Sequence, residues 1–340
     1  MAFTDVFLNN NEPYIIAEIG GNFNTIDEGI KLINAAKTNG ANCVKIQTYR
    51  ADTITTKNAL FDMENISGVS QYDYFKQSEL SEEAHIKLMK YAKSINIDFF
   101  STPSHKTDVD FLQSINIQAF KIGADDATNI PLIKYIAATQ KPVFLSTGMC
   151  YLEEVIESIN AIKEEGNNQI VIFHTISNYP AHPQDLNLNV ITTLKNSFPD
   201  CVIGFSDHSI GINAAIVAFS LGAKVIEKHF TLDKNAPGPD HMLSITPDEL
   251  KQLSQTLHQI KLMYGSPEKK PYGTEIKNRI LNRKSIVAIK DIQPGETFSP
   301  HNIDIKRPGG GIHPKLIYNI YNKKAKRYIK ADELIKTSDF

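Results

Sequence analysis

Short β-branched and aromatic runs alternate with longer amphipathic runs along most of the chain, and this alternation limits the folds open to it. Eight runs have the character of strands: 14–19, 42–47, 98–102, 119–123, 142–147, 170–175, 202–206 and 224–230. Helical periodicity fills the intervals between them. Eight strand–helix units predict an α/β fold, a (β/α)8 TIM barrel over about 1–265. A doubly wound sheet is the alternative, but it usually has fewer strands and a Gly-rich dinucleotide turn that this sequence lacks.

The pattern changes after the last repeat. Thr246 and Pro247 suit the cap and first position of a final helix that carries Leu250, Leu253 and Leu257 on one face. A polar segment with Pro and Gly follows, and it predicts a linker at 266–281. Short strand-like runs and Gly-rich turns then predict a small β-rich domain at 282–340. A domain of that size has marginal stability alone, so we expect it to pack on the barrel or on a partner subunit.

Composition excludes several kinds of partner. Lys plus Arg is 36 against 38 for Asp plus Glu, a formal net charge of -2, so no nucleic acid is expected as a partner. No apolar run reaches the ~18–20 residues of a membrane span, so no membrane association is expected either. The first 14 residues lack the pattern of a signal peptide, and Cys43, Cys150 and Cys201 are too few for a disulfide framework. These features predict a cytoplasmic protein.

Nearly every predicted strand ends in polar residues, which in a barrel lie at the catalytic face. Lys45 and Lys121 stand within apolar strands, where an unpaired ammonium group is costly to bury. Each lysine could pair with a structural carboxylate such as Glu18 or Asp125. The hydroxyl groups that join the lysines at the same face favour a bound phosphate or carboxylate instead.

His208 and His229 follow the last two strands, which are neighbours in a closed barrel. Two neutral imidazoles so placed can ligate one divalent metal ion, although acid–base roles fit the same spacing. Asp240 and His241 lie on the turn 237–241, which fits either this mouth or a plain surface turn. The residues alone therefore predict a barrel enzyme that handles a small anion and uses a metal ion.

The strand-end motifs occur together in a specific order: AEIGGN (17–22), VKIQTY (44–49), FFSTPS (99–104), FKIG (120–123), LSTGM (145–149), SNYPA (177–181), GFSDHS (204–209), EKHFTLD (227–233) and PGPDH (237–241). With them the chain closely resembles the sialic acid synthase family, which makes nonulosonic acids. The segments at 283–285, 292–296 and 306–312 also resemble the antifreeze-like (SAF-type) C-terminal domain of that family.

The resemblance implies a metal-dependent condensation of phosphoenolpyruvate with the open-chain aldehyde of an N-acylated hexosamine, with release of phosphate. It assigns Mn²⁺ or Mg²⁺ to His208 and His229, catalytic roles to Glu18, Glu227 and Asp126, and sugar contacts to Asn22, Gln47 and Asp240. The residues implied for phosphoenolpyruvate are Lys45, Thr102, Lys121, Ser146, Ser177, Tyr179, Ser206 and Arg307. Arg307 matches an arginine that reaches the partner subunit's active site, which implies a domain-swapped homodimer.

Several residues depart from the family pattern. Phe23 replaces a histidine near the sugar end, and Ala124 replaces a serine that could donate to phosphate. Asp126 stands where glutamate is frequent, and Ser177 where some members carry asparagine. The expected sugar is N-acetylmannosamine, giving N-acetylneuraminate. The alternatives are a diacetamido-trideoxyhexose giving legionaminic or pseudaminic acid, a pyruvate aldolase, and a sugar-binding homologue without activity.

Overall fold

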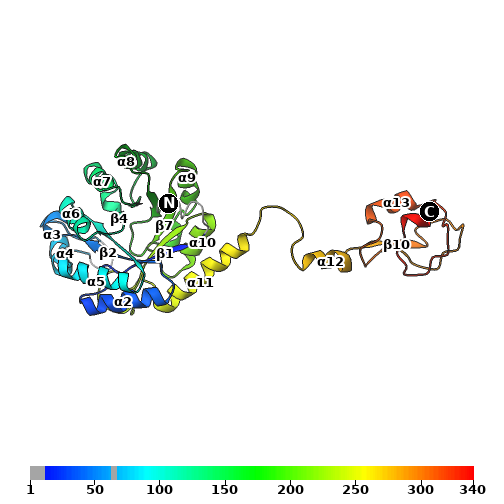
Figure 1. Ribbon diagram of the computed structural model, residues 1–340, viewed down its shortest axis with the longest axis horizontal. Helices are drawn as coiled ribbons and strands as arrows, with labels where there is room; N and C mark the ends of the chain where they lie inside the picture. The colour runs from blue at the N-terminus through cyan, green and yellow to red at the C-terminus, as the bar shows by residue number, and fades with distance from the viewer. Residues whose placement is uncertain (1–11, 63–66) are drawn as a thin grey trace. The chain divides into compact units, whose positions relative to one another are not determined.

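The computed structural model describes residues 12–62 and 67–340, which form two compact units, Met1–Gly265 and Ser266–Phe340 (Figure 1). Most of the N-terminal stretch used to exclude a signal peptide lies outside the described residues. Across the described part of the chain, no helix is long and apolar enough to cross a membrane. Cys43, Cys150 and Cys201 are all free thiols, as a chain without a disulfide framework requires.

The first unit is a closed barrel of parallel strands, which confirms the predicted fold. Strand β1 closes the barrel on β8, with Tyr14 beside Val225 and Glu18 beside His229. The strands are β1 (Tyr14–Glu18), β2 (Cys43–Thr48), β3 (Asp98–Pro103), β4 (Phe120–Ile122), β5 (Val143–Ser146), β6 (Ile170–Thr175), β7 (Val202–Asp207) and β8 (Val225–His229).

A ring of helices covers the outside of the strands (Figure 1). Thr246 caps the last of these helices and Glu249 completes a capping box, as the sequence predicts. The ring consists of α2 (Ile26–Thr38), α5 (Glu82–Ser94), α6 (Lys106–Ser114), α7 (Ile130–Ala137), α8 (Leu152–Glu164), α9 (Val190–Ser197), α10 (Asn213–Leu221) and α11 (Pro247–Tyr264). Two further helices, α3 (Ala51–Ile54) and α4 (Gln71–Ser78), are inserted between β2 and α5.

Three phenylalanines fill part of the barrel interior. The rings of Phe100 and Phe144 stack with centroids 4.7 Å apart, and Phe144 stacks on Phe173 at 6.0 Å. The ammonium group of Lys121 lies 4.5 Å from the centroid of the Phe173 ring. The charged side chain of Lys121 therefore packs directly against this aromatic layer.

The second unit is small and has its own apolar core, which includes Ile286, Ile292, Phe298 and Ile303. Strands β9 (Ser285–Ala288) and β10 (Ile303–Lys306) pair antiparallel, and α13 (Ile317–Ile320) packs with them. The predicted linker at 266–281 contains most of an amphipathic helix, α12 (Glu275–Asn282).

Candidate active site

The carboxyl ends of the strands surround a cavity of about 570 Å³. Because successive strands of a (β/α)8 barrel are parallel, their last residues meet at this one mouth. Most of the residues expected at the site line the cavity: Glu18, Lys45, Gln47, Thr102, Lys121, Ser146, Ser177, Tyr179, Ser206, His208, Glu227 and His229.

Four buried charges lie at the base of the cavity and balance one another. Lys121 Nζ lies 2.7 Å from Glu227 Oε1, and Lys45 forms an ion pair with Glu18. Lys45 also lies 3.9 Å from Glu227, so Glu227 bridges the two lysines. Both lysines therefore pair with buried carboxylates, which was one of the two possibilities that the sequence left open. Lys121 pairs across the barrel with Glu227 and not with Asp125, which is exposed at the rim.

Burial and mutual attraction set the protonation of this cluster. Burial raises the pKa of Glu227, but Lys121 and Lys45 outweigh burial and lower it to about 2. Burial lowers the pKa of Lys121 to about 8, partly offset by Glu227. Burial also raises the pKa of Glu18, against the effect of Lys45. At neutral pH the site therefore holds two ammonium groups whose charges an incoming anion can share.

Hydroxyl groups surround the charges. Thr102 Oγ1 accepts a hydrogen bond from Lys45 Nζ at 3.1 Å, and Ser206 donates to Glu227 Oε1 at 3.0 Å. The Ser177 hydroxyl is buried and has no hydrogen-bond partner. An unpaired buried hydroxyl facing a cavity is an available donor to a ligand. Cations and hydroxyl donors together form the surroundings that carboxylate and phosphate groups require.

His208 and His229 lie side by side at the mouth, with ring centroids 5.4 Å apart. His208 Nδ1 donates to the Ile176 carbonyl oxygen at 2.6 Å, which leaves the lone pair on Nε2. Burial lowers the pKa of His208 to about 4 and lowers the pKa of His229 further below its usual range. Both imidazoles are therefore neutral, the form that binds metal ions. His229 Nδ1 is buried and makes no hydrogen bond, with Asp240 Oδ2 3.6 Å away.

The donor set fits a divalent metal ion held by two histidines. Among residues 12–62 and 67–340, no group of three or more His, Cys, Asp or Glu side chains could hold a metal by itself. Two protein ligands leave coordination positions for water and substrate oxygens, as a catalytic metal needs. The Tyr179 ring stacks on His208 at 4.1 Å and meets His229 edge-on at 5.9 Å, which restrains both imidazoles.

Three expected site residues of the barrel unit do not line the cavity. Asn22 donates to the Phe230 carbonyl oxygen at 3.0 Å and to Ser244 Oγ at 2.9 Å, so it ties the loops after β1 and β8 together. Asp126 accepts a hydrogen bond from Asn129 at 2.8 Å, and its neighbour Asp125 faces the cavity in its place.

Asp240 is the third of these residues, and it lies behind His229. Its Oδ2 atom is 3.6 Å from His229 Nδ1. Burial, reinforced by Glu18, raises the pKa of Asp240 to about 7. Asp240 is thus placed to orient His229, although it does not line the cavity itself.

The structure adds an apolar wall that the sequence did not indicate. Tyr49, Ile54, Phe61 and Phe75 line one side of the cavity, and all but Tyr49 come from the insertion between β2 and α5. The aromatic rings pack edge-to-face, with Tyr49 and Phe75 centroids 5.1 Å apart and Phe61 and Phe75 5.7 Å apart. The sequence did contain one signal for this insertion: the distance along the chain between the second and third strands is about twice that between other successive strands.

The residues that depart from the family pattern lie at different distances from the cavity. Ala124 lines it, so a hydroxyl is missing there. Phe23 is only 8% exposed and packs in the barrel core, so it does not remove a polar group from the cavity wall. Arg307 belongs to the second unit, where its Nη1 atom lies 3.4 Å from Asn282 Oδ1 on the exposed surface.

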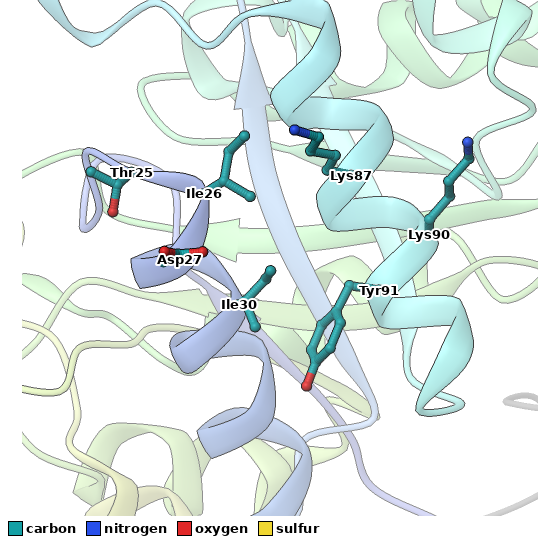
Figure 2. Close-up of a pocket in the computed structure, with 7 residues that line it drawn as sticks. All are labelled: Thr25, Ile26, Asp27, Ile30, Lys87, Lys90 and Tyr91. Carbon is teal, nitrogen blue, oxygen red and sulfur yellow. The ribbon is translucent and has the colours of Figure 1, made fainter.

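A second hollow, of about 600 Å³, lies on the outside of the barrel between α2 and α5 (Figure 2). Ile26, Ile30 and Tyr91 form its floor, and Lys87 and Lys90 stand along α5 at its edge. Lys87 is already paired with Glu83 at 2.6 Å. Its seven lining residues include no buried charge cluster and no histidine pair, in contrast to the residues at the barrel mouth.

The fold and its mouth define a (β/α)8-barrel protein whose candidate active site combines buried lysines, hydroxyl groups and a histidine pair. Within that class the chain belongs to the NeuB family, which it matches over residues 32–269, and residues 283–340 match the SAF domain. These matches confirm the resemblance to the sialic acid synthase family and to its C-terminal domain.

Relatives with assigned activities match nearly the whole chain. The N,N'-diacetyllegionaminic acid synthase of Legionella pneumophila is 40% identical over 94% of this chain and 92% of its own length. The pseudaminic acid synthase of Campylobacter jejuni is 35% identical over 98% of both chains. Among solved structures, the N-acetylneuraminic acid synthetase of Leptospira borgpetersenii, crystallised with citrate, has a TM-score of 0.72 at 29% identity and covers 79% of this chain and 91% of its own.

Proposed function

We propose that the protein is a nonulosonic acid synthase, which condenses phosphoenolpyruvate with an N-acylated aminosugar and releases phosphate. The observation that carries this proposal is the buried cluster of Lys45 and Lys121 with Glu18 and Glu227 at the barrel mouth. Two buried ammonium groups bridged by one carboxylate suit a small substrate that carries both a carboxylate and a phosphate.

In this reaction, carbon 3 of phosphoenolpyruvate forms a bond to the aldehyde carbon of the sugar, whose oxygen takes up a proton. Water adds to carbon 2, and the bond between carbon 2 and the phosphate oxygen breaks. Lys45, Lys121 and the hydroxyls of Thr102, Ser146 and Ser206 hold the anionic groups of phosphoenolpyruvate. Ser177 and Tyr179 close the same side of the cavity, and Gln47 faces the sugar.

Proton transfer falls to one of the carboxylates of the cluster. Glu18, whose pKa is raised by burial, is the carboxyl group better suited to accept and return a proton, and Glu227, which its two lysines keep ionised, holds both ammonium groups in place. His208 and His229 would hold Mn²⁺ or Mg²⁺, and such an ion polarises an aldehyde oxygen as a Lewis acid. Asp240 and Asn22 support the site from behind, and Asp126 stabilises the turn that presents Asp125.

The sugar we propose is a 2,4-diacetamido-2,4,6-trideoxyhexose, in place of the N-acetylmannosamine expected from the sequence. This sugar has a methyl group and a second acetamido group where N-acetylmannosamine has hydroxyls, and the wall of Tyr49, Ile54, Phe61 and Phe75 suits that apolar character. Among the described residues that line the cavity, the only lysines are Lys45 and Lys121, so the barrel itself offers a 6-phosphate no further cation. The legionaminic and pseudaminic acid synthases among the relatives support the same choice.

The decisive experiment is phosphate release from phosphoenolpyruvate with a panel of sugars, in Mn²⁺ and then in EDTA. The panel contains N-acetylmannosamine, its 6-phosphate and the two diacetamido-trideoxyhexoses that lead to legionaminic and pseudaminic acid. We expect release that depends on metal and is fastest with a diacetamido-trideoxyhexose. If folded protein releases no phosphate with any sugar of the panel, the result contradicts a synthase and supports a sugar-binding homologue. Condensation of pyruvate with one of these sugars, without phosphate release from phosphoenolpyruvate, would indicate an aldolase.

The activity should fall at alkaline pH because Lys121 loses its proton there. The pKa of Lys121 is lowered by burial to about 8, so the cation is present below pH 8 and is lost above it. We expect kcat/KM for phosphoenolpyruvate to fall about tenfold per pH unit above that point, since this ratio reports ionisations of the free enzyme. The Lys121→Arg variant should give a flat profile over the same range, because a guanidinium stays protonated. An identical alkaline limb in both proteins would contradict the assignment.

We also propose the domain-swapped homodimer, in which Arg307 completes the partner's active site. Arg307→Ala should then lower turnover and leave the barrel folded. Mixing this variant with His208→Ala tests the swap, because a mixed dimer contains one barrel with an intact His208 that receives an intact Arg307 from the other chain. We expect the mixture to regain activity that neither variant has alone. No recovery, with mixed dimers verified by mass, would contradict the exchange.

A further inference from the structure

An ion pair lies directly beside the two histidines but faces away from the cavity. Asp207 ends β7 and Lys228 lies in β8, and the two residues are register partners on adjacent strands. Lys228 Nζ lies 3.1 Å from Asp207 Oδ2, and both side chains are fully buried, at 0% exposure. Neither residue lines the cavity, so neither has a place in the chemistry described above.

Each residue of the pair directly precedes one of the two histidines in the sequence, and both residues hold Ser209, the residue after His208. Asp207 Oδ1 accepts hydrogen bonds from the Ser209 backbone N–H at 2.8 Å and from the Ser209 hydroxyl at 2.7 Å. Lys228 Nζ donates to the Ser209 carbonyl oxygen. His208 is thus fixed between two anchored neighbours, and Lys228, which directly precedes His229, ties this loop to β8.

Stability alone does not account for a pair buried this completely. Replacing a buried ion pair by apolar or neutral residues of similar volume is often neutral or stabilising, because both charges lose their hydration. A buried polar network does impose one arrangement on the elements that it joins. The hydrogen bonds of this network run through Ser209, while Asp207 Oδ2 contacts Lys228 without a hydrogen bond. Here those elements are the ends of β7 and β8, whose next residues are the histidines.

We propose that Asp207 and Lys228 form a clamp that fixes the spacing of His208 and His229 and thereby sets the affinity of the site for a divalent metal ion. The inference rests on the proposed metal site of a synthase. Both residues are positioning residues, since they act through the backbone next to the imidazoles. Groups that orient metal ligands typically change metal affinity about 10- to 100-fold when they are altered.

The test variant is the double replacement Asp207→Asn with Lys228→Met, which removes both charges and leaves neither unpaired. Asn keeps an acceptor for the Ser209 N–H, and Met fills the volume of the lysine stem. The matched control is Lys134→Met with Glu164→Gln, which removes the exposed pair between α7 and α8. The readouts are Mn²⁺ affinity of the protein alone by electron paramagnetic resonance, thermal unfolding, and KM for phosphoenolpyruvate and kcat at saturating Mn²⁺.

We expect the double variant to bind Mn²⁺ about 10- to 100-fold more weakly than the unaltered protein and the control. Saturating Mn²⁺ should restore kcat, with KM for phosphoenolpyruvate within twofold. Mn²⁺ affinity within threefold of the unaltered protein would overturn the clamp, and so would a loss of affinity accompanied by a raised KM and a kcat that metal does not restore. If the unaltered protein itself binds no Mn²⁺, the proposed metal site fails together with the clamp.

Ser209→Ala decides the matter if the double variant does not fold. This variant removes only the Ser209 hydroxyl, which donates a hydrogen bond to Asp207, and it keeps the charges of Asp207 and Lys228. We expect Mn²⁺ affinity to fall a few-fold with no change in KM for phosphoenolpyruvate. An unchanged affinity in Ser209→Ala would overturn the clamp.

Discussion

Lys121→Met is expected to lower kcat/KM for phosphoenolpyruvate by about thirty- to several thousandfold, since truncating one partner of a buried charged contact costs about 2–5 kcal/mol. Lys121 lies 3% exposed above Phe173, so water cannot replace its ammonium group. The loss should fall mainly on phosphoenolpyruvate affinity, measured by calorimetry and by KM, with the sugar KM nearly unchanged.

The same variant leaves Glu227 as a buried charge with one cation fewer, so it should also lose stability. The double variant Lys121→Met with Glu227→Gln removes both charges of the 2.7 Å pair and should regain stability without regaining phosphoenolpyruvate binding. Lys134→Met, on the outer surface, is the matched control and should bind phosphoenolpyruvate normally. A folded Lys121→Met protein with phosphoenolpyruvate affinity within threefold of the unaltered protein would contradict the assignment.

The barrel was predictable because its signals are local. Each strand is a short apolar run such as 170–175, and each ends at the place where polar residues begin. Once eight such runs close into a barrel, their ends must meet, so the sequence could bring Lys45, Lys121, His208 and His229 to one mouth. Closure itself follows from the count of strand–helix units and needs no knowledge of side-chain contacts.

The partners of these residues were not predictable, because they depend on how side chains cross the barrel. Lys121 in β4 pairs with Glu227 in β8 across the interior, while Asp125, nearer in sequence, is turned to the rim by the tight turn at 124–126. For the same reason Asn22 was expected at the sugar, whereas its amide binds Phe230 and Ser244. The sequence predicts at which strand end a residue lies, but it does not predict the direction in which the side chain points.

The apolar wall was missed for a different reason. The helices α3 and α4 are short and have no clear hydrophobic face, and α4 buries no residue. The aromatic residues of α4 pack on Tyr49 and on Phe61, which precedes α4, so the wall arises from tertiary contacts within the segment between β2 and α5. Loops at the catalytic face of a barrel are where substrate specificity resides. The residues that determine sugar specificity are therefore the ones that local sequence patterns predict least well.

His208→Ala is expected to abolish the response to Mn²⁺ and to lower phosphate release by roughly a thousandfold, since a Lewis-acid metal contributes several kcal/mol to the transition state. The physical reason is that burial keeps His208 neutral and the Ile176 carbonyl fixes its tautomer, so few other groups could take its place. His229→Ala should behave in the same way, because the pair offers only two protein ligands.

His182→Ala is the matched control, since His182 is exposed and outside the cavity lining. Electron paramagnetic resonance of Mn²⁺ and phosphate release with and without EDTA distinguish the two chemistries open to this pair. Loss of Mn²⁺ binding together with loss of activity supports a metal site. An enzyme that is fully active in EDTA, and whose His208→Ala variant changes only the pH profile, would contradict the metal site and assign an acid–base role to His208.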